Sequence, residues 1–87
     1  MFRIGYMATS LKGHDRNRRY IVVLEDGDMV GLADGVHRGL ANPKYKKKKH
    51  IQIIKDNAVA DYFDSIKDDD NADELIRRIL EDMKNDN

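Results

Sequence analysis

The side chains best suited to binding chemistry are the cations within residues 11–19. This stretch separates two apolar segments and contains Gly13 and Asn17, residue types that tolerate a positive φ angle. The pattern predicts a hairpin loop with a positively charged tip. Arginine can bind phosphate through two parallel hydrogen bonds and can stack on nucleobases, so such a tip suits a polyanion. The cations of the loop are Lys12, Arg16, Arg18 and Arg19.

A second basic stretch covers residues 44–50, in which lysines surround Tyr45 and His50 follows. Like charges at this density repel one another, so the stretch is expected to be an exposed arm or loop. Lysines that neutralise phosphates release condensed counterions and give affinity for nucleic acid without sequence readout. A solubilising surface loop is the alternative. The Tyr45 ring is expected either to stack on an unpaired base or to lie back on the domain. The lysines are Lys44, Lys46, Lys47, Lys48 and Lys49.

The acidic and imidazole side chains give no sign of catalysis or metal binding. Asp15 is expected to cap backbone N–H groups in the turn, and the alternatives are that it orients Arg16 or Arg18 or repels wrong partners. His14, His37 and His50 share no ligand spacing, so no metal site is predicted. The sequence has no nucleophile elbow and no phosphate-binding glycine-rich loop. We therefore expect a protein that is not an enzyme and uses no cofactor.

Length and composition predict one small domain with opposite charges in its two parts. An 87-residue chain buries only a thin core, and the absence of cysteine excludes a disulfide framework. No apolar run approaches the roughly 20 residues of a membrane span, and the N-terminus has no signal-peptide pattern, so a cytoplasmic protein is expected. Residues 1–55 contain 12 Lys and Arg against 5 Asp and Glu, whereas residues 56–87 contain 4 against 11. The net charges of +7 and −7 indicate a polyanion-binding part and an acidic appendage.

Alternating and apolar segments predict five short strands. The run that follows Arg19 is apolar without a break, which indicates burial on both faces of a sheet. Asp26-Gly27 and Asp34-Gly35 predict tight hairpin turns. The predicted strands are residues 3–10, 19–25, 29–33, 36–40 and 50–54, with Arg38 on the fourth. Short strands with these turns predict a mainly β fold, a small SH3-like five-stranded barrel.

From residue 56 the hydrophobic period changes from 2 to 3.6, which predicts helices. Asp56 or Asn57 is expected to cap a short helix that ends near Ile66. Asn71 lies three residues before Glu74, a capping-box arrangement that predicts the start of a second helix. A helix of about 13 residues is marginal alone, so its apolar stripe must pack on the barrel, a second copy or another protein. The stripe consists of Ala72, Leu75, Ile76, Ile79, Leu80 and Met83.

Short motifs follow one another in a defined order through residues 3–54. They are Gly5, Ala8 and Ser10 at fixed spacing, Gly13-His14-Asp15-Arg16, Leu32-Ala33-Asp34-Gly35, Arg38, and Asn42-Pro43 followed by residues 44–50. The first part resembles the KOW motif, which marks small RNA-binding barrels of ribosomal proteins and transcription elongation factors. The fuller set resembles bacterial KOW-domain RNA-binding proteins, which are similar to a eukaryotic-type large-subunit ribosomal protein. This family usually has a second glycine where the chain has Asn17, and Asn also tolerates the left-handed backbone.

The resemblance implies a KOW/SH3-like RNA-binding barrel in residues 1–55, followed by an acidic helical C-terminal extension in residues 56–87. It also implies association with ribosomes or translation, with His14 and His50 as donors to RNA. We therefore predict a protein that binds structured RNA, ribosomal RNA in particular, through shape and phosphate contacts. The predicted RNA-binding residues are Lys12, His14, Arg16, Arg18, Arg19, Arg38, Lys44, Tyr45, Lys46, Lys47, Lys48, Lys49 and His50.

Two alternatives assign the C-terminal helix a functional role. In the first, the protein is an interaction adaptor, an elongation-factor-like KOW platform that docks a protein partner through the helix. The docking residues would be Leu75, Ile76, Ile79, Leu80 and Met83. In the second, the acidic extension folds over the basic face and competes with RNA, as the opposite charges of the two parts would permit.

Overall fold

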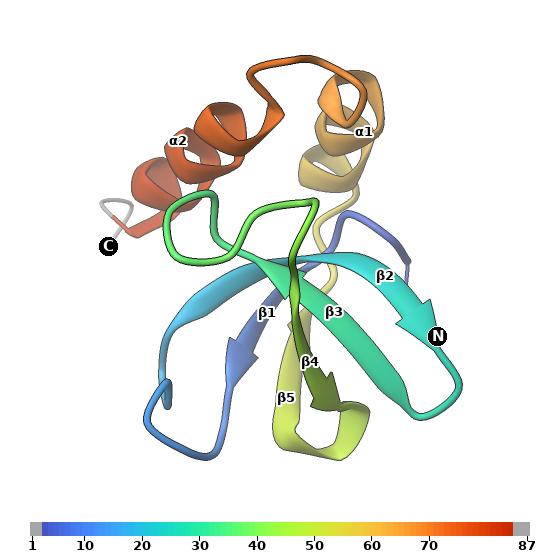
Figure 1. The fold of residues 1–87 in the computed structure, drawn as a ribbon, viewed down its shortest axis with the longest axis vertical. Helices are drawn as coiled ribbons and strands as arrows, with labels where there is room; N and C mark the ends of the chain where they lie inside the picture. The colour runs from blue at the N-terminus through green and yellow to red at the C-terminus, as the bar shows by residue number, and fades with distance from the viewer. Residues whose placement is uncertain (1–2, 85–87) are drawn as a thin grey trace.

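The computed structural model describes residues 3–84, which form a five-stranded antiparallel sheet followed by two α-helices. Both helices lie together at one end of the sheet (Figure 1). The strands are β1 (Met7–Ser10), β2 (Arg19–Asp26), β3 (Met29–Ala33), β4 (Lys44–Lys47) and β5 (Ile51–Ile54). A short 3₁₀ helix, η1 (Lys48–His50), precedes β5, and the α-helices are α1 (Asn57–Ile66) and α2 (Ala72–Lys84). A five-stranded antiparallel sheet followed by helices is therefore confirmed, although the fourth strand is not the one predicted.

The strands lie in the order β4-β3-β2-β1-β5, and each neighbouring pair is antiparallel. Strand β1 lies between β2 and β5 and pairs with both, since Met7 lies opposite Ile21 of β2 and opposite Ile54 of β5. The pairing of β2 with β3 shifts register between Val22 and Leu24, an irregularity of the kind that bends a strand. Strands β4 and β5 form the two edges, and no ladder joins these edges within the described chain.

The first strand begins at Met7 rather than at residue 3, so the predicted start was wrong. Ile4 and Gly5 form a turn instead, and Gly5 has a φ angle of +101°. A Cβ atom at this glycine would lie 2.9 Å from the Cα atom of Ala60, so the chain passes directly against the backbone of α1. Gly5 therefore serves a turn that contacts a helix.

Residues 36–40 form a loop, so the fourth strand predicted there was wrong. One carboxylate oxygen of Asp34 accepts hydrogen bonds from the backbone N–H groups of Val36, His37 and Arg38, each at 2.9 Å. Amides that donate to a nearby side chain are not available to a neighbouring strand. The turn that begins at Asp34 therefore leads into a compact loop rather than a hairpin.

The lysine-rich stretch forms a strand rather than an exposed arm, which corrects another prediction. Residues 44–47 are β4 and pair with β3 along their whole length. Side chains alternate along a strand, so Lys44 and Lys46 point to one face while Tyr45 and Lys47 point to the other. Charge repulsion was the reason to expect an arm. It is relieved because the first two lysines share a buried carboxylate, described below.

Two apolar clusters form the core. Consecutive side chains of β2 enter different clusters, because Ile21 lies in one while Tyr20 and Val22 lie in the other. The burial of β2 on both faces is therefore confirmed. The cluster that the helices share with the sheet consists of Met7, Ile21, Ala33, Phe63, Ile66, Ala72, Ile76 and Leu80. The other cluster consists of Ala8, Tyr20, Val22, Val30, Leu32 and Ile51.

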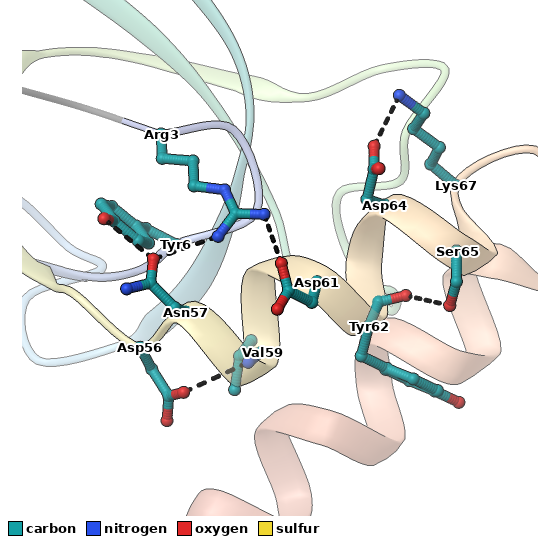
Figure 2. A network of polar contacts seen from close by, with 10 residues as sticks. All are labelled: Arg3, Tyr6, Asp56, Asn57, Val59, Asp61, Tyr62, Asp64, Ser65 and Lys67. Atoms are coloured by element: carbon teal, nitrogen blue, oxygen red, sulfur yellow. Dashed lines mark hydrogen bonds and ion pairs between the residues drawn. The ribbon is translucent and has the colours of Figure 1, made fainter.

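Helix α1 begins with a capped turn and is tied to the N-terminal segment (Figure 2). The Asp56 carboxylate accepts a hydrogen bond from the Val59 N–H group at 3.2 Å, so Asp56 is the cap. The Asn57 side-chain oxygen instead accepts a hydrogen bond from the Arg3 guanidinium at 3.0 Å. The same guanidinium forms an ion pair with Asp61 at 2.6 Å. These contacts hold α1 beside the turn that precedes β1.

Candidate nucleic-acid interface

Asp15 lies at the centre of a buried polar cluster beneath the basic loop, and only 4% of its surface is exposed. Its carboxylate accepts hydrogen bonds from the hydroxyl groups of Ser10, at 3.1 Å, and Tyr20, at 3.2 Å. It also lies 2.9 Å from the ammonium groups of Lys44 and Lys46. We call these five residues the Asp15 cluster. Every partner found for this carboxylate in the described chain is a hydroxyl or a lysine. The predicted turn cap and the arginine alternative were therefore both wrong.

Lys46 fastens the basic loop to β4. In addition to its ion pair with Asp15, its ammonium group donates a hydrogen bond to the Ser10 hydroxyl at 2.8 Å and another to the Lys12 carbonyl oxygen. An ammonium group has three donors, so all of them are satisfied here. The Lys46 side chain is 12% exposed. The loop is thus held to a strand that comes 36 residues after Ser10 in the chain.

The Asp15 cluster changes the role of two predicted RNA-binding lysines. Burial alone would raise the pKa of the Asp15 carboxyl, but hydrogen bonds from the two lysines and Ser10 outweigh burial and hold the pKa well below its usual range. The carboxylate is therefore ionised throughout the physiological pH range, and it offsets one of the two lysine charges. Lys46 is committed to the cluster, whereas Lys44, whose side chain is 33% exposed, retains some access to solvent.

Ionisation of Tyr20 is expected to lower the free energy of unfolding at alkaline pH. Burial, then the Asp15 charge and the hydrogen bond to it, raises the pKa of Tyr20 to about 12. An unfolded tyrosine ionises at about pH 10. The contribution of Tyr20 to stability is therefore complete below about pH 10 and is lost as the pH rises toward 12. Denaturant unfolding between about pH 10 and pH 12 should show a smaller decline in the free energy of unfolding for Tyr20→Phe than for the native protein. Equal declines would contradict the prediction.

Several exposed cations gather where the basic loop meets the connection between β4 and β5. The Leu11 N–H group donates a hydrogen bond to the His50 carbonyl oxygen at 2.9 Å, which brings the two segments together. Partial desolvation, followed by the nearby charges of Lys12 and Lys49, lowers the pKa of His50. His50 is therefore mainly neutral at pH 7, and a phosphate placed here would favour its charged form.

Other predicted RNA-binding side chains are exposed in separate places. Tyr45 is 54% exposed and lies with Lys47 on the face of β4 that points away from the Asp15 cluster. The basic loop turns at Asn17, whose φ angle of 72° confirms that this residue adopts the left-handed conformation. The exposed residues of the loop with basic or imidazole side chains are Lys12, His14, Arg16 and Arg18.

Three further predicted residues are paired or half-buried in the fold. Arg19 donates a hydrogen bond to the Met83 carbonyl oxygen at 3.1 Å, near the C-terminal end of α2, where a positive charge is favourable. Lys48 forms an ion pair with Glu25. Arg38 is half-buried in the loop that Asp34 organises. Of the thirteen predicted residues, Lys44 and Lys46 therefore contact Asp15, Lys48 contacts Glu25 and Arg19 contacts α2.

Sequence reasoning missed two acidic residues that shape the surface beside the basic loop. Asp34 holds the loop of residues 34–38 through its three backbone hydrogen bonds. Asp73 of α2 accepts a hydrogen bond from the Leu40 N–H group at 2.9 Å, across 33 residues of sequence. An Asp at the start of a turn is a known signal for such a loop and could have indicated Asp34. The contact of Asp73 has no comparable local signal.

The predicted partner-binding stripe of α2 is largely used inside the protein. Ile76 is fully buried and Leu80 is 9% exposed, and both belong to the core cluster that the sheet and helices share. The remaining stripe residues are half-buried and line a groove of about 410 Å³ between α1 and α2, where Tyr62 is 44% exposed. These residues are Leu75, Ile79 and Met83. In this fold only this half of the stripe is accessible to another molecule.

Comparisons with known proteins supply no identity for the chain: no protein-family model matches it, and no curated protein proved similar to it. Among residues 3–84, no three His, Cys, Asp or Glu side chains come together as a group that could hold a metal ion. Neither α1 nor α2 is long and apolar enough to cross a membrane. The function must therefore be inferred from the basic loop, β4 and their surroundings.

Proposed function

We propose that this protein binds structured RNA through the exposed cations of the basic loop and of residues 47–50. The observation that carries the proposal is the position of Asp15. It is the only carboxylate in residues 11–19, residues 44–50 contain none, and it is buried and paired with lysines. The exposed side chains that these two segments contribute to the surface therefore include cations and no anions. Such a surface attracts a polyanion by releasing its condensed counterions.

The chemistry favours contacts with the sugar-phosphate backbone over sequence readout. Lys12, Lys47 and Lys49 offer flexible point charges, and Arg16 adds a planar guanidinium that can hold a phosphate through two hydrogen bonds. The exposed ring of Tyr45 provides a surface on which an unpaired base could stack. We therefore propose an RNA that combines a helical part with unpaired nucleotides, as ribosomal RNA does.

The proposal extends to the fold type and to the cellular role. Support for an SH3-like barrel of the KOW type comes from the strand order, the register shift in β2 and the short η1 between the two edge strands. The motif resemblance supports a place in translation, at the ribosome in the cytoplasm. The protein would act by binding alone, without catalysis or a cofactor.

Removing two exposed lysines should weaken RNA binding and its salt dependence. Each phosphate contact contributes about 0.9 to the slope of log K against log salt concentration, so Lys47→Gln with Lys49→Gln should reduce the slope by about 2. Binding to a ribosomal RNA fragment can be measured by fluorescence anisotropy across a salt series.

The matched control is the double variant Lys67→Gln with Arg78→Gln, which removes the same charge from the residue after α1 and from α2. This control should leave the slope nearly unchanged. Equal reductions in both double variants would show a response to net charge alone and would contradict the assigned surface. Binding by the native protein that is weak and independent of salt would overturn the proposed function.

A further inference from the structure

A cleft of about 480 Å³ lies beside the basic loop, and its walls come from three separate parts of the chain. One wall is the end of the loop and the start of β2, the second is the loop of residues 34–38, and the third is the C-terminal half of α2. We call it the α2 cleft. The side chains that matter for its chemistry are Arg18, Val36, His37, Arg77 and Leu80.

The wall formed by residues 34–38 is rigidly attached to α2. The three backbone hydrogen bonds to Asp34 fix its shape. Gly35 lies so close to α2 that a Cβ atom there would overlap the Asp73 carbonyl oxygen and lie 2.8 Å from the backbone nitrogen of Arg77. The hydrogen bond from Leu40 to Asp73 attaches the other end of this segment. This fixed loop therefore holds Val36 and His37 at the edge of the cleft.

The opposite wall is held equally firmly. The Arg18 carbonyl oxygen accepts a hydrogen bond from the Ser10 N–H group at 3.1 Å, and the Asn17 N–H group donates to the Ser10 carbonyl oxygen at 2.8 Å. Arg19 links this segment to α2 through the Met83 carbonyl oxygen. A cleft with fixed walls loses little conformational entropy when it receives a ligand, which favours binding.

The chemistry of the α2 cleft suits a ligand with a negative group and an apolar, flat part. Three arginines line it against two carboxylates, Asp34 and Glu81, and one of the three, Arg77, also donates two hydrogen bonds to Glu74, so a phosphate would use its remaining N–H donors. One oxygen of Asp34 is occupied by three backbone N–H groups, which reduces its influence on a ligand. The apolar part of the lining includes Val36, which is 62% exposed, and Leu80 at the edge of the core. A nucleotide combines a phosphate with a flat base in one unit of suitable size.

We propose that the α2 cleft receives one unpaired nucleotide of the bound RNA. Arg18 and Arg77 would hold its phosphate, and the base would lie against Val36 and His37. This inference rests on the proposed function, because the basic loop supplies both Arg18 to the cleft and Lys12 to the phosphate-binding surface. An RNA that contacts the loop is therefore led to the cleft, and the protein selects RNA with a nucleotide outside a helix.

The test compares two RNA hairpins that differ by a single bulged nucleotide. The native protein should bind the bulged hairpin about tenfold more tightly than the fully paired one, as expected for one additional base contact. Arg77→Gln should remove most of this preference. Arg78→Gln is the control, because it removes the same charge from the same helix and also loses an ion pair with Glu74, although a weaker one at 3.4 Å, while Arg78 lines the groove between α1 and α2 instead. It should retain the preference.

The other outcomes distinguish failure of the α2 cleft as a site from failure of the proposed function. Equal affinity of the native protein for the two hairpins, or equal effects of the two variants, would overturn the α2 cleft as the site. The proposed function would survive that result if the Lys47 and Lys49 variants still lowered the salt slope. A nucleoside monophosphate that shifts the His37 and Asn17 NMR signals while neither hairpin binds would identify a free nucleotide as the ligand and would overturn the RNA proposal. No response to any of these ligands would overturn both proposals.

Discussion

Asp15→Asn is expected to lower the free energy of unfolding by about 3–5 kcal/mol, the cost of removing one partner from a buried ion pair. The Asp15 side chain is 6% exposed and that of Lys46 is 12% exposed, so the charge left on Lys46 would have little access to water. A domain of this size has a total stability of roughly 4–13 kcal/mol. The substitution should therefore consume a large part of the stability, as denaturant unfolding can measure.

A double-mutant cycle separates the ion pair from general disruption. Lys46→Met alone should also be strongly destabilising, because it leaves the Asp15 carboxylate with fewer partners. The double variant Asp15→Asn with Lys46→Met should cost less than the sum of the two single changes, since neither member of this pair is then left without the other. Asp61→Asn is the exposed control and should change stability little, because its pair with Arg3 has side chains that are 71% and 40% exposed. Additive effects would contradict a coupled pair.

Asp15→Asn should also change how the free energy of unfolding falls at acid pH. The folded state holds the pKa of Asp15 below its usual range, so the unfolded chain binds a proton first as the pH falls. The contribution of Asp15 is thus complete above about pH 4, the unfolded value, and is lost progressively below it. Asp15→Asn should therefore show a shallower decline below about pH 4 than the native protein.

Gly35→Ala is expected to destabilise the protein by about 3 kcal/mol or more, the second large effect. Gly35 has a φ angle of +80°, which is strained for alanine. The added Cβ atom would also meet backbone atoms of Asp73 and Arg77, and backbone cannot move aside as a flexible side chain does. Either the loop or α2 must shift, so the α2 cleft should open. Denaturant unfolding gives the loss of stability.

Gly27→Ala is the matched control for this prediction. Gly27 also has a positive φ angle, +60°, but no atom lies within 4 Å of the position that its Cβ would take. Its cost should be limited to backbone strain, about 1 kcal/mol. The difference between the two variants measures the contact of Gly35 with α2. Similar losses at both positions would show that this contact contributes nothing.

Both large effects concern contacts that hold the proposed binding surfaces in place. Without the Asp15 cluster, the basic loop loses the lysine that ties it to β4, so the exposed cations of the loop would no longer be presented in one arrangement. Without the contact at Gly35, the wall that carries His37 would separate from α2. Measurements of RNA binding on these variants should therefore be accompanied by measurements of their folded fraction.

Local patterns in the sequence were sufficient to predict most of the elements. Strand β3 occupies residues 29–33 as expected, because it is apolar and follows a turn at Asp26-Gly27. The two helices lie within the stretch of helical period, and Asp56 was one of two expected caps. These features depend on the side-chain periodicity of each element and on the conformational preferences of Gly, Asp and Asn. Such signals are contained within a few neighbouring residues.

The sequence by itself therefore determined four of the five strands and both helices, and also the concentration of positive charge in the loop and in the lysine-rich stretch. Only the tertiary structure decided which cations remain exposed. A carboxylate at position 15 meets lysines about 30 residues later, and the loop after Asp34 meets Asp73 of α2. Local periodicity carries no information about such distant pairs. Burial of the Asp15 carboxylate makes its pairing with Lys44 and Lys46 costly to break, which favours residues 44–47 as a strand, while the contact with Asp73 attaches the loop that Asp34 organises to α2.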